Sequence, residues 1–173
     1  LNPSTIWGGS QDNGPYKVTS SGSRSWGETD TYTMSVDPSN SNIVYTRNLI
    51  TLTRSTDGGN IWYSIKTGII PGSAWALTNI CIDPVNRNVL YYGDAHFYKS
   101  TNRGDSWTAI STIPDNRVIN WIAVNPSNNK IIYVATLGVI FKSTDGGYNW
   151  MQTSFPLVGT AQVVIDPKNN TTL

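Results

Sequence analysis

The sequence predicts an all-β protein built from four-stranded antiparallel units that repeat along the chain. Three observations predict this fold class: a short motif that ends in tryptophan recurs, an Asp-Pro or Asn-Pro turn recurs in step with it, and each unit contains four short runs of β-forming residues. No window of helical length shows apolar residues at a 3.6-residue period. Units of this kind and length are the blades of a β-propeller.

The tryptophan motif is eight residues long. Its strongest copies are STDGGNIW at 55–62 and STDGGYNW at 143–150, with weaker copies STNRGDSW at 100–107 and TSSGSRSW at 19–26. The closing tryptophans are spaced 36, 45 and 43 residues apart; they are Trp26, Trp62, Trp107 and Trp150. This spacing is in the range of propeller blades and solenoid repeats.

The second marker is an Asp-Pro or Asn-Pro pair after an apolar run, and each copy precedes an Asn-rich turn. The pairs are Asp37-Pro38, Asp83-Pro84, Asn125-Pro126 and Asp166-Pro167. Two markers that recur in the same phase make chance similarity implausible. Together they place blade units at approximately 1–27, 28–70, 71–113 and 114–156, followed by a final innermost strand within 157–173, at Thr160 to Ile165.

The third full unit shows the four runs most clearly. An apolar run covers 118–124, a Pro-Asn turn follows, and runs rich in Ile, Val and Tyr cover 130–135 and 139–142. A fourth run starts at Asn149. We expect the first strand to be the most buried and the more polar fourth strand to be the outer edge.

The tryptophan motif falls in the turn between the third and fourth strands. There, an Asp side chain accepts hydrogen bonds from the N–H groups of its own turn, glycines supply positive φ, and the indole is buried against the neighbouring sheet. We therefore expect a structural role for Asp57, Gly58, Trp62, Asn102, Trp107, Asp145, Gly146 and Trp150. Replacement of the Asp by Ser21 or Asn102, and of a Gly by Arg103, is tolerable in a scaffold turn.

The text Ser-Thr-Asp-Gly-Gly-x-x-Trp resembles the Asp box, or BNR repeat, of sialidases, family 74 glycoside hydrolases, sortilin-type receptors and photosystem assembly factors. The repeat pattern Asp-Pro-x-Asn-x-Asn followed by (Tyr/Phe)-Lys-Ser-Thr looks most like the repeats of family 74 and secreted bacterial Asp-box proteins. The segment Gln11 to Gly14 is similar to a sequence found in the secreted bacterial proteins. The resemblance covers essentially the whole chain. It implies a propeller fold and leaves function open.

Blade accounting gives about four blades. The chain begins with three strands of a first unit and ends with one innermost strand, so it either closes as a four-bladed ring or is a segment of a larger one. Because Asp-box rings usually have more than four blades, we expect a segment whose remaining blades lie elsewhere. The chain opens with Leu1 and not Met, as a processed or excised piece would.

Composition excludes several partner classes. Charged residues make up 13% of the chain and the net charge is +1, so neither nucleic acid nor membrane insertion is expected. The single cysteine, Cys81, excludes an internal disulfide and is expected to be a buried structural thiol. Few Lys and Glu beside many Ser, Thr, Asn, Trp and Tyr favour a secreted or cell-surface protein.

Function is expected at the end of the blades opposite the Asp boxes. In a four-stranded meander the turns after strands one and three lie at one end, and the remaining loops lie at the other. The candidate ligand-binding residues on those loops are Gln11, Asp12, Asn13, Asp30, Arg47, Trp75, Asp94, His96 and Arg117. Trp75 is the better platform for a sugar ring, whereas Trp121 is expected in the core. His96 has no second His or Cys near it, so no metal or other cofactor is expected.

Three functions remain open. The first is a secreted scaffold that binds an oligosaccharide, a polysaccharide or a protein partner. The second is a fragment of a family 74-like glycoside hydrolase acting on a β-glucan or xyloglucan, with Asp12 or Asp94 as a catalytic carboxylate. The third is an assembly or receptor propeller that binds peptide segments.

The resemblance itself weighs against catalysis by this chain alone. Family 74 enzymes carry a catalytic Asp after a Tyr-Ala-Arg-Thr-Asp-like segment, and the matching text Tyr45-Thr46-Arg47 is followed here by Asn48. Their carboxylate pair is also divided between two propeller domains. Glycoside hydrolysis needs two carboxyl groups about 5 to 9.5 Å apart, and the Arg-Ile-Pro segment of sialidases is missing.

Overall fold

A computed structural model describes residues 5–10, 14–25, 30–48, 51–70, 78–156, 159 and 162–166. The chain divides into two compact units, Leu1–Lys66 and Thr67–Leu173. Regular structure within the described residues is β-sheet apart from one 3₁₀ turn, η1 (Pro114–Asn116). The described residues form no helix long and apolar enough to cross a bilayer.

The first unit contains two antiparallel sheets in chain order. The three-stranded sheet consists of β1 (Ile6–Ser10), β2 (Gly14–Thr19) and β3 (Gly22–Ser25). The four-stranded sheet consists of β4 (Thr33–Val36), β5 (Val44–Arg47), β6 (Leu52–Ser55) and β7 (Tyr63–Ser64).

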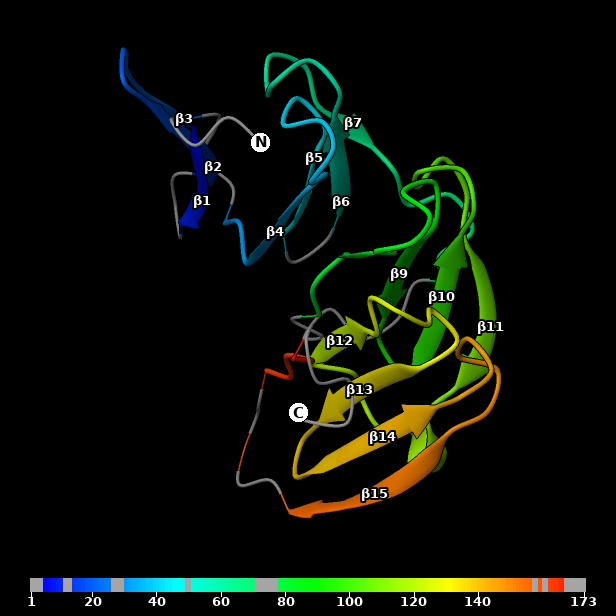
Figure 1. Cartoon of the computed structure of the whole chain (residues 1–173). Coiled ribbons are helices and arrows are strands. Elements are labelled where there is room, and N and C mark those ends of the chain that lie inside the picture. Colours follow the sequence, from blue (N-terminus) through cyan, green and yellow to red (C-terminus); the bar gives the residue numbers. More distant parts are fainter. Residues whose placement is uncertain are drawn as a thin grey trace. The chain divides into compact units, whose positions relative to one another are not determined.

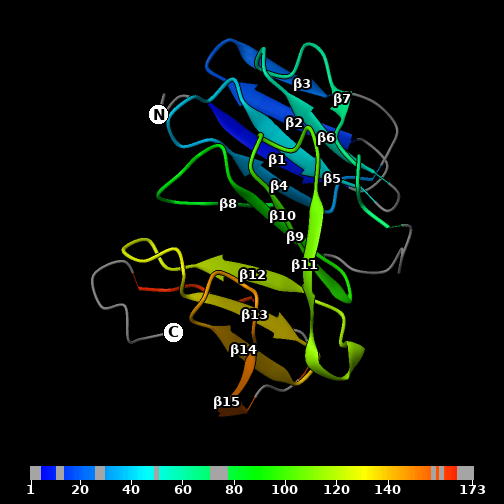
Figure 2. The same cartoon turned by 90° about the vertical axis from the view of Figure 1, so that its right-hand side faces the viewer.

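The second unit contains two four-stranded antiparallel sheets, drawn in green and in yellow to orange (Figures 1 and 2). One consists of β8 (Cys81–Ile82), β9 (Leu90–Gly93), β10 (His96–Ser100) and β11 (Thr108–Thr112). The other consists of β12 (Trp121–Val124), β13 (Ile132–Thr136), β14 (Val139–Ser143) and β15 (Met151–Pro156). These meanders confirm the all-β, blade-like architecture that the sequence predicts.

Three of the four Asp-Pro and Asn-Pro markers, Asp37-Pro38, Asp83-Pro84 and Asn125-Pro126, form the turns between the first two strands of a blade, while Pro167 of the fourth lies outside the described residues. The buried Asp83 carboxylate accepts the N–H groups of Val85 and Asn86 at 2.8 and 3.0 Å. Asn125 does the same for Ser127 and Asn128, at 2.9 and 3.1 Å. A short polar side chain therefore satisfies backbone donors that the tight turn leaves without a strand partner.

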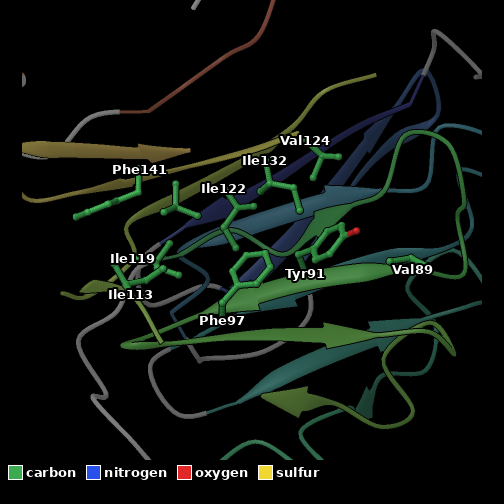
Figure 3. Close-up of a cluster of buried hydrophobic side chains, with 10 residues drawn as sticks. Val89, Tyr91, Phe97, Ile113, Ile119, Ile122, Val124, Ile132 and Phe141 are labelled. Atoms are coloured by element: carbon green, nitrogen blue, oxygen red, sulfur yellow. The ribbon is translucent and has the colours of Figure 1, made fainter. Parts of the chain in front are cut away.

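The core of the second unit lies between its two sheets. Figure 3 shows Tyr91 and Phe97 of one sheet facing Ile122 and Ile132 of the other. Ile119, which precedes β12, is fully buried in the same cluster. Each large apolar side chain buried in this way stabilises the fold by about 1.5 to 3 kcal/mol.

Two expectations about single segments are wrong. Residues 162–166 belong to no strand; Val163 and Ile165 instead pack against the β13 side chains Tyr133 and Ala135. The weakest motif copy forms a plain hairpin, because Thr19 pairs directly with Gly22 and leaves only Ser20 and Ser21 in the turn. Trp26, which closes that copy, lies outside the described residues.

Candidate functional site

The three stronger motif copies, residues 55–62, 100–107 and 143–150, share one geometry and are called box turns below. In the first, Asp57 Oδ1 accepts the Ser55 hydroxyl at 2.9 Å and the N–H groups of Asn60 and Ile61 at 2.9 and 3.0 Å. The Gly59 N–H donates to Ser55 Oγ at 2.8 Å. These hydrogen bonds, from the Ile61 N–H above all, lower the pKa of Asp57.

Asp145 holds the last box turn in the same way. Its Oδ1 accepts the N–H groups of Tyr148 and Asn149 at 3.0 Å each. The Asn149 side chain donates to Oδ2 at 2.7 Å, and it is the main reason that the pKa of Asp145 is lowered to about 2. The carboxylate is occupied by its own turn.

The middle box turn shows why its two substitutions are tolerated. Asn102 Oδ1 accepts the Ser100 hydroxyl and the Ser106 N–H at 2.9 and 3.0 Å, so an amide oxygen replaces the carboxylate. Arg103 takes the left-handed conformation, φ 59°, that glycine takes in the other two copies. Its Nε donates to Asn88 Oδ1 at 2.8 Å.

Each box turn is joined to the turn between the first two strands of its own blade. The N–H groups of Gly58, Arg103 and Gly146 donate to the carbonyl oxygens of Asn42, Asn88 and Lys130 at 3.0, 2.9 and 2.9 Å. In these three blades, the hydrogen bonds therefore place both markers at the same end, as predicted.

Two of the closing tryptophans pack on the blade that precedes their own. Trp62 meets Trp7 of β1 edge to face, with ring centroids 6.3 Å apart. Trp150 meets Phe97 of β10 at 4.9 Å, and its indole N–H donates to Ser111 Oγ at 2.9 Å. The box turns are thus structural links between neighbouring sheets.

At the opposite end of the second unit, the structure joins the predicted site residues Asp94 and His96. Asp94 lies in the β9–β10 turn and His96 opens β10; Asp94 Oδ1 accepts the His96 N–H at 2.6 Å and lies 3.1 Å from its ring Nδ1. The Asp94 side chain is 5% exposed and the imidazole is 35% exposed. The carboxylate orients the ring and leaves its outer edge available to a ligand.

Sequence reasoning missed the aromatic side chains beside His96. Tyr98 lies two residues along the same strand, with its ring centroid 5.8 Å from that of His96, and Tyr92 stacks on Tyr98 at 6.0 Å. Burial, together with the charge of Asp94, raises the pKa of Tyr98 to about 12. The signal was available, because residues i and i+2 of a strand share a face.

Arg117 belongs to the same end of the second unit. Its Nη1 donates to the carbonyl oxygen of Leu137, in the β13–β14 turn, at 3.0 Å. Its Nε lies 3.8 Å from the exposed carboxylate of Asp115. The loop also joins the Asp94 turn, since the Ile119 N–H donates to the Asp94 carbonyl at 2.8 Å.

In the first unit, Tyr32 brings two predicted residues together. Its hydroxyl donates to Asp30 Oδ2 at 2.9 Å, and its N–H donates to the carbonyl oxygen of Arg47 at 2.9 Å. Arg47 is only 2% exposed, whereas Tyr32 is 39% exposed. The other predicted site residues lie outside the described part of the chain: Gln11, Asp12, Asn13 and Trp75.

Asp94, the described catalytic candidate, has a side chain that is 5% exposed, and its Oδ1 is bonded to the backbone N–H of His96 in its own turn. Within the described segments, no three His, Cys, Asp or Glu side chains are grouped so that they could hold a metal ion.

No family model matches the chain. Two curated proteins are similar to it in sequence. A xyloglucanase from Hypocrea jecorina is 30% identical over 127 residues, which are 66% of this chain and 15% of the relative. A probable oligoxyloglucan-reducing end-specific xyloglucanase from Neosartorya fischeri is 30% identical over 79 residues, 41% of this chain and 10% of the relative. The chain spans only a small part of the length of both.

Solved structures share the fold at low identity. The GH74 enzyme of Niastella koreensis superimposes with a TM-score of 0.67 at 22% identity, covering 87% of this chain and 28% of that one. The extracellular domain of a putative one-component system, BT4673, from B. thetaiotaomicron gives a TM-score of 0.75 at 12% identity, covering 96% of this chain and 24% of that one.

Proposed function

We propose that this chain is part of an extracellular xyloglucanase-type propeller and that it binds a β-glucan or xyloglucan chain without hydrolysing it alone. The observation that carries the proposal is the likeness to two curated proteins that are both named xyloglucanases. The BT4673 likeness, to a domain described as extracellular, supports the secreted setting.

The binding surface would be the end of the blades opposite the box turns. There, the half-exposed imidazole of His96 is oriented by Asp94, and the Arg117 guanidinium is held by Leu137. Such groups donate to and accept from sugar hydroxyls, and aromatic side chains stack on sugar rings. Trp75 remains the predicted stacking platform.

Calorimetric titration with xyloglucan oligosaccharides tests the proposal, with mannan oligosaccharides as the unrelated sugar. His96→Ala and Trp75→Ala should each weaken binding by about 10-fold or more, as expected for the loss of a buried hydrogen bond or stacking contact. Arg103→Ala is the matched control, because it removes a side chain at the box-turn end. Equal affinity for both sugars, or equal loss in the control, would contradict the proposal.

The catalytic alternative has its own assay. The unmodified chain should release no reducing ends from xyloglucan above the level of a heat-denatured sample. If it does release them, Asp12→Asn and Asp94→Asn should each abolish the release, and the binding-only proposal would be wrong.

The further proposal of missing blades is tested by mass. The chain covers 15% of the Hypocrea relative, which supports a longer native protein. Intact mass spectrometry of the protein from its source should give a mass well above 19.0 kDa. A native mass near that value would remove this part of the proposal and favour a ring closed by this chain.

A further inference from the structure

The tautomer of His96 follows from its contact with Asp94. Asp94 Oδ1 accepts the His96 backbone N–H at 2.6 Å and lies 3.1 Å from the ring Nδ1. An ionised carboxylate only accepts hydrogen bonds, so the proton of the neutral ring belongs on Nδ1. Turning the ring over would place a C–H group against the carboxylate and lose this hydrogen bond. Nε2 therefore carries a lone pair and is a hydrogen-bond acceptor.

Backbone hydrogen bonds hold the turn that carries Asp94. The Asp94 N–H donates to the His96 carbonyl at 3.0 Å, and the Asp94 carbonyl accepts the Ile119 N–H at 2.8 Å. The Ala95 carbonyl accepts the Ile113 N–H at 3.1 Å. Ile113 and Ile119 are both buried. These bonds fix the position of the carboxylate before a ligand arrives, which lowers the ordering cost of binding.

The outer edge of the imidazole is open to a ligand. The His96 side chain is 35% exposed, although the carboxylate beside it is almost completely buried. Its ring lies 5.8 Å from the buried ring of Tyr98, centroid to centroid, so the imidazole also packs on the strand that carries it. Among the described residues, none is hydrogen-bonded to Nε2. The acceptor at Nε2 is thus held in place and unused.

The strand register adds a second polar group beside this acceptor. His96 of β10 pairs with Thr112 of β11. Directly opposite residues of an antiparallel pair project from the same face of the sheet, with Cβ atoms about 4.5 to 5.5 Å apart. Thr112 is exposed. An oriented acceptor and a hydroxyl group therefore lie side by side at the end of this strand pair.

From this geometry we propose that His96 Nε2 and the Thr112 hydroxyl bind two neighbouring hydroxyl groups of a neutral sugar ring. One sugar hydroxyl donates to Nε2, and the next accepts from Thr112. Asp94 is the positioning residue, because it keeps the proton on Nδ1. A carboxylate or sulfate group has no proton to donate to Nε2, so acidic sugars are disfavoured at this point. The inference rests on the function proposed above and adds Thr112 and the direction of each hydrogen bond.

The tautomer can be measured directly, because the chain contains one histidine. Nitrogen-15 NMR at about pH 8.5, above the range in which histidine ordinarily titrates, should show a proton on Nδ1 and none on Nε2. Addition of a xyloglucan oligosaccharide should move the Nε2 resonance more than the Nδ1 resonance. A proton on Nε2, or an oligosaccharide that binds without moving the Nε2 resonance, would overturn the inference. Absence of any binding would overturn the proposed function and the sugar contacts with it, while the tautomer would still be established by the spectrum.

Asp94→Asn tests the positioning role. An amide group can donate to Nδ1, so the fraction of rings with the proton on Nδ1 should fall. The affinity should fall by the same factor, about 3- to 10-fold, because only that tautomer binds. Asp115→Asn is the matched control, since that carboxylate is 81% exposed and lies beside Arg117; both the tautomer and the affinity should stay as they are. Affinity that falls in Asp94→Asn without a change of tautomer would contradict the positioning role.

Two threonine variants locate the second contact. Thr112→Val removes the hydroxyl and keeps the shape of the side chain, so it should weaken binding about 3- to 10-fold. Thr108 is an exposed threonine of the same strand that pairs with Lys99, toward the box-turn end. Thr108→Val should therefore leave the affinity unchanged. Equal affinities of the two variants would refute the contact with Thr112.

Discussion

The side-chain amide of Asn79 pairs with both backbone groups of Ile122. Asn79 Oδ1 accepts the Ile122 N–H at 2.8 Å, and Nδ2 donates to the Ile122 carbonyl at 3.1 Å. Asn79 precedes β8, while Ile122 lies in β12, and both residues are buried. One side chain therefore gives the innermost strand of one blade a hydrogen-bond partner in the preceding blade.

Asn79→Ala should lower the free energy of unfolding by about 2 to 4 kcal/mol, because it leaves a buried donor and a buried acceptor unpaired. Asn86→Ala is the control, since Asn86 Oδ1 accepts the Asn88 N–H at 3.1 Å in an exposed turn. That change should cost about 1 kcal/mol or less. Urea denaturation of both variants measures the difference. Equal losses of unfolding free energy would mean that the buried amide pair stabilises the fold no more than the exposed turn hydrogen bond does.

Gly147→Ala should be much more destabilising than Gly146→Ala. Both glycines have positive φ, 96° and 83°, so each substitution incurs about 1 to 2 kcal/mol of backbone strain. A Cβ at 147 would also lie 2.3 Å from Phe97 Cε1, whereas one at 146 meets no atom within 4 Å. The overlap should add about 1 to 3 kcal/mol. Thermal unfolding of the two variants side by side is the measurement, and indistinguishable melting temperatures would disprove the contact.

The box-turn carboxylates predict acid sensitivity. The pKa of Asp145 is lowered to about 2, chiefly by Asn149, and that of Asp57 is lowered chiefly by the Ile61 N–H. A lowered folded-state pKa means that the unfolded chain binds more protons. The stabilisation is therefore complete above the ordinary Asp pKa of about 3.9 and is lost as the pH falls toward 2.

The double variant Asp57→Asn and Asp145→Asn tests this assignment. Asn102 shows that an amide oxygen can hold the same turn, so the variant should fold and its melting temperature should fall less steeply between pH 5 and pH 2. Melting curves across that range are the measurement. An unchanged slope would place the acid sensitivity elsewhere.

Cys81 should be unreactive in the folded protein. The residue as a whole is only partly buried, but burial of its thiol raises the pKa to about 12, so little of it is thiolate at pH 8. An ordinary cysteine has a pKa of about 8.5, and the difference predicts a reaction roughly 1,000-fold slower with a disulfide reagent. Denaturant should restore the fast rate. Rapid labelling of the folded chain would show that the thiol is accessible.

The fold could be predicted from the sequence because its signals are local. Asp57 and Asp145 make their hydrogen bonds within four residues along the chain, so their turns are legible without tertiary information. The copy at 19–26 was wrongly predicted to form the same turn, because its match to the other copies depends on aligning the tryptophans. Lys17 lies nine residues before Trp26, whereas the equivalent Lys142 lies eight residues before Trp150, so the copy at 19–26 is one residue out of register. Val18 thus takes the place of the serine that accepts the glycine N–H elsewhere, and a short hairpin forms instead.

The candidate site was predicted only in part. Loop accounting placed Asp94 and His96 together, but the direct bond between them and the stacking of Tyr98 depend on side-chain geometry.

The packing of Trp62 on Trp7 and of Trp150 on Phe97 has a consequence for how such a chain can change in length. Each of these blades supplies an indole that packs against an aromatic ring of the blade before it. A deletion that ends inside a blade would separate an indole from the ring it packs on, whereas duplication of a whole unit adds one new indole and one new aromatic partner together. Gain or loss of sequence should therefore be tolerated in steps of one complete repeat.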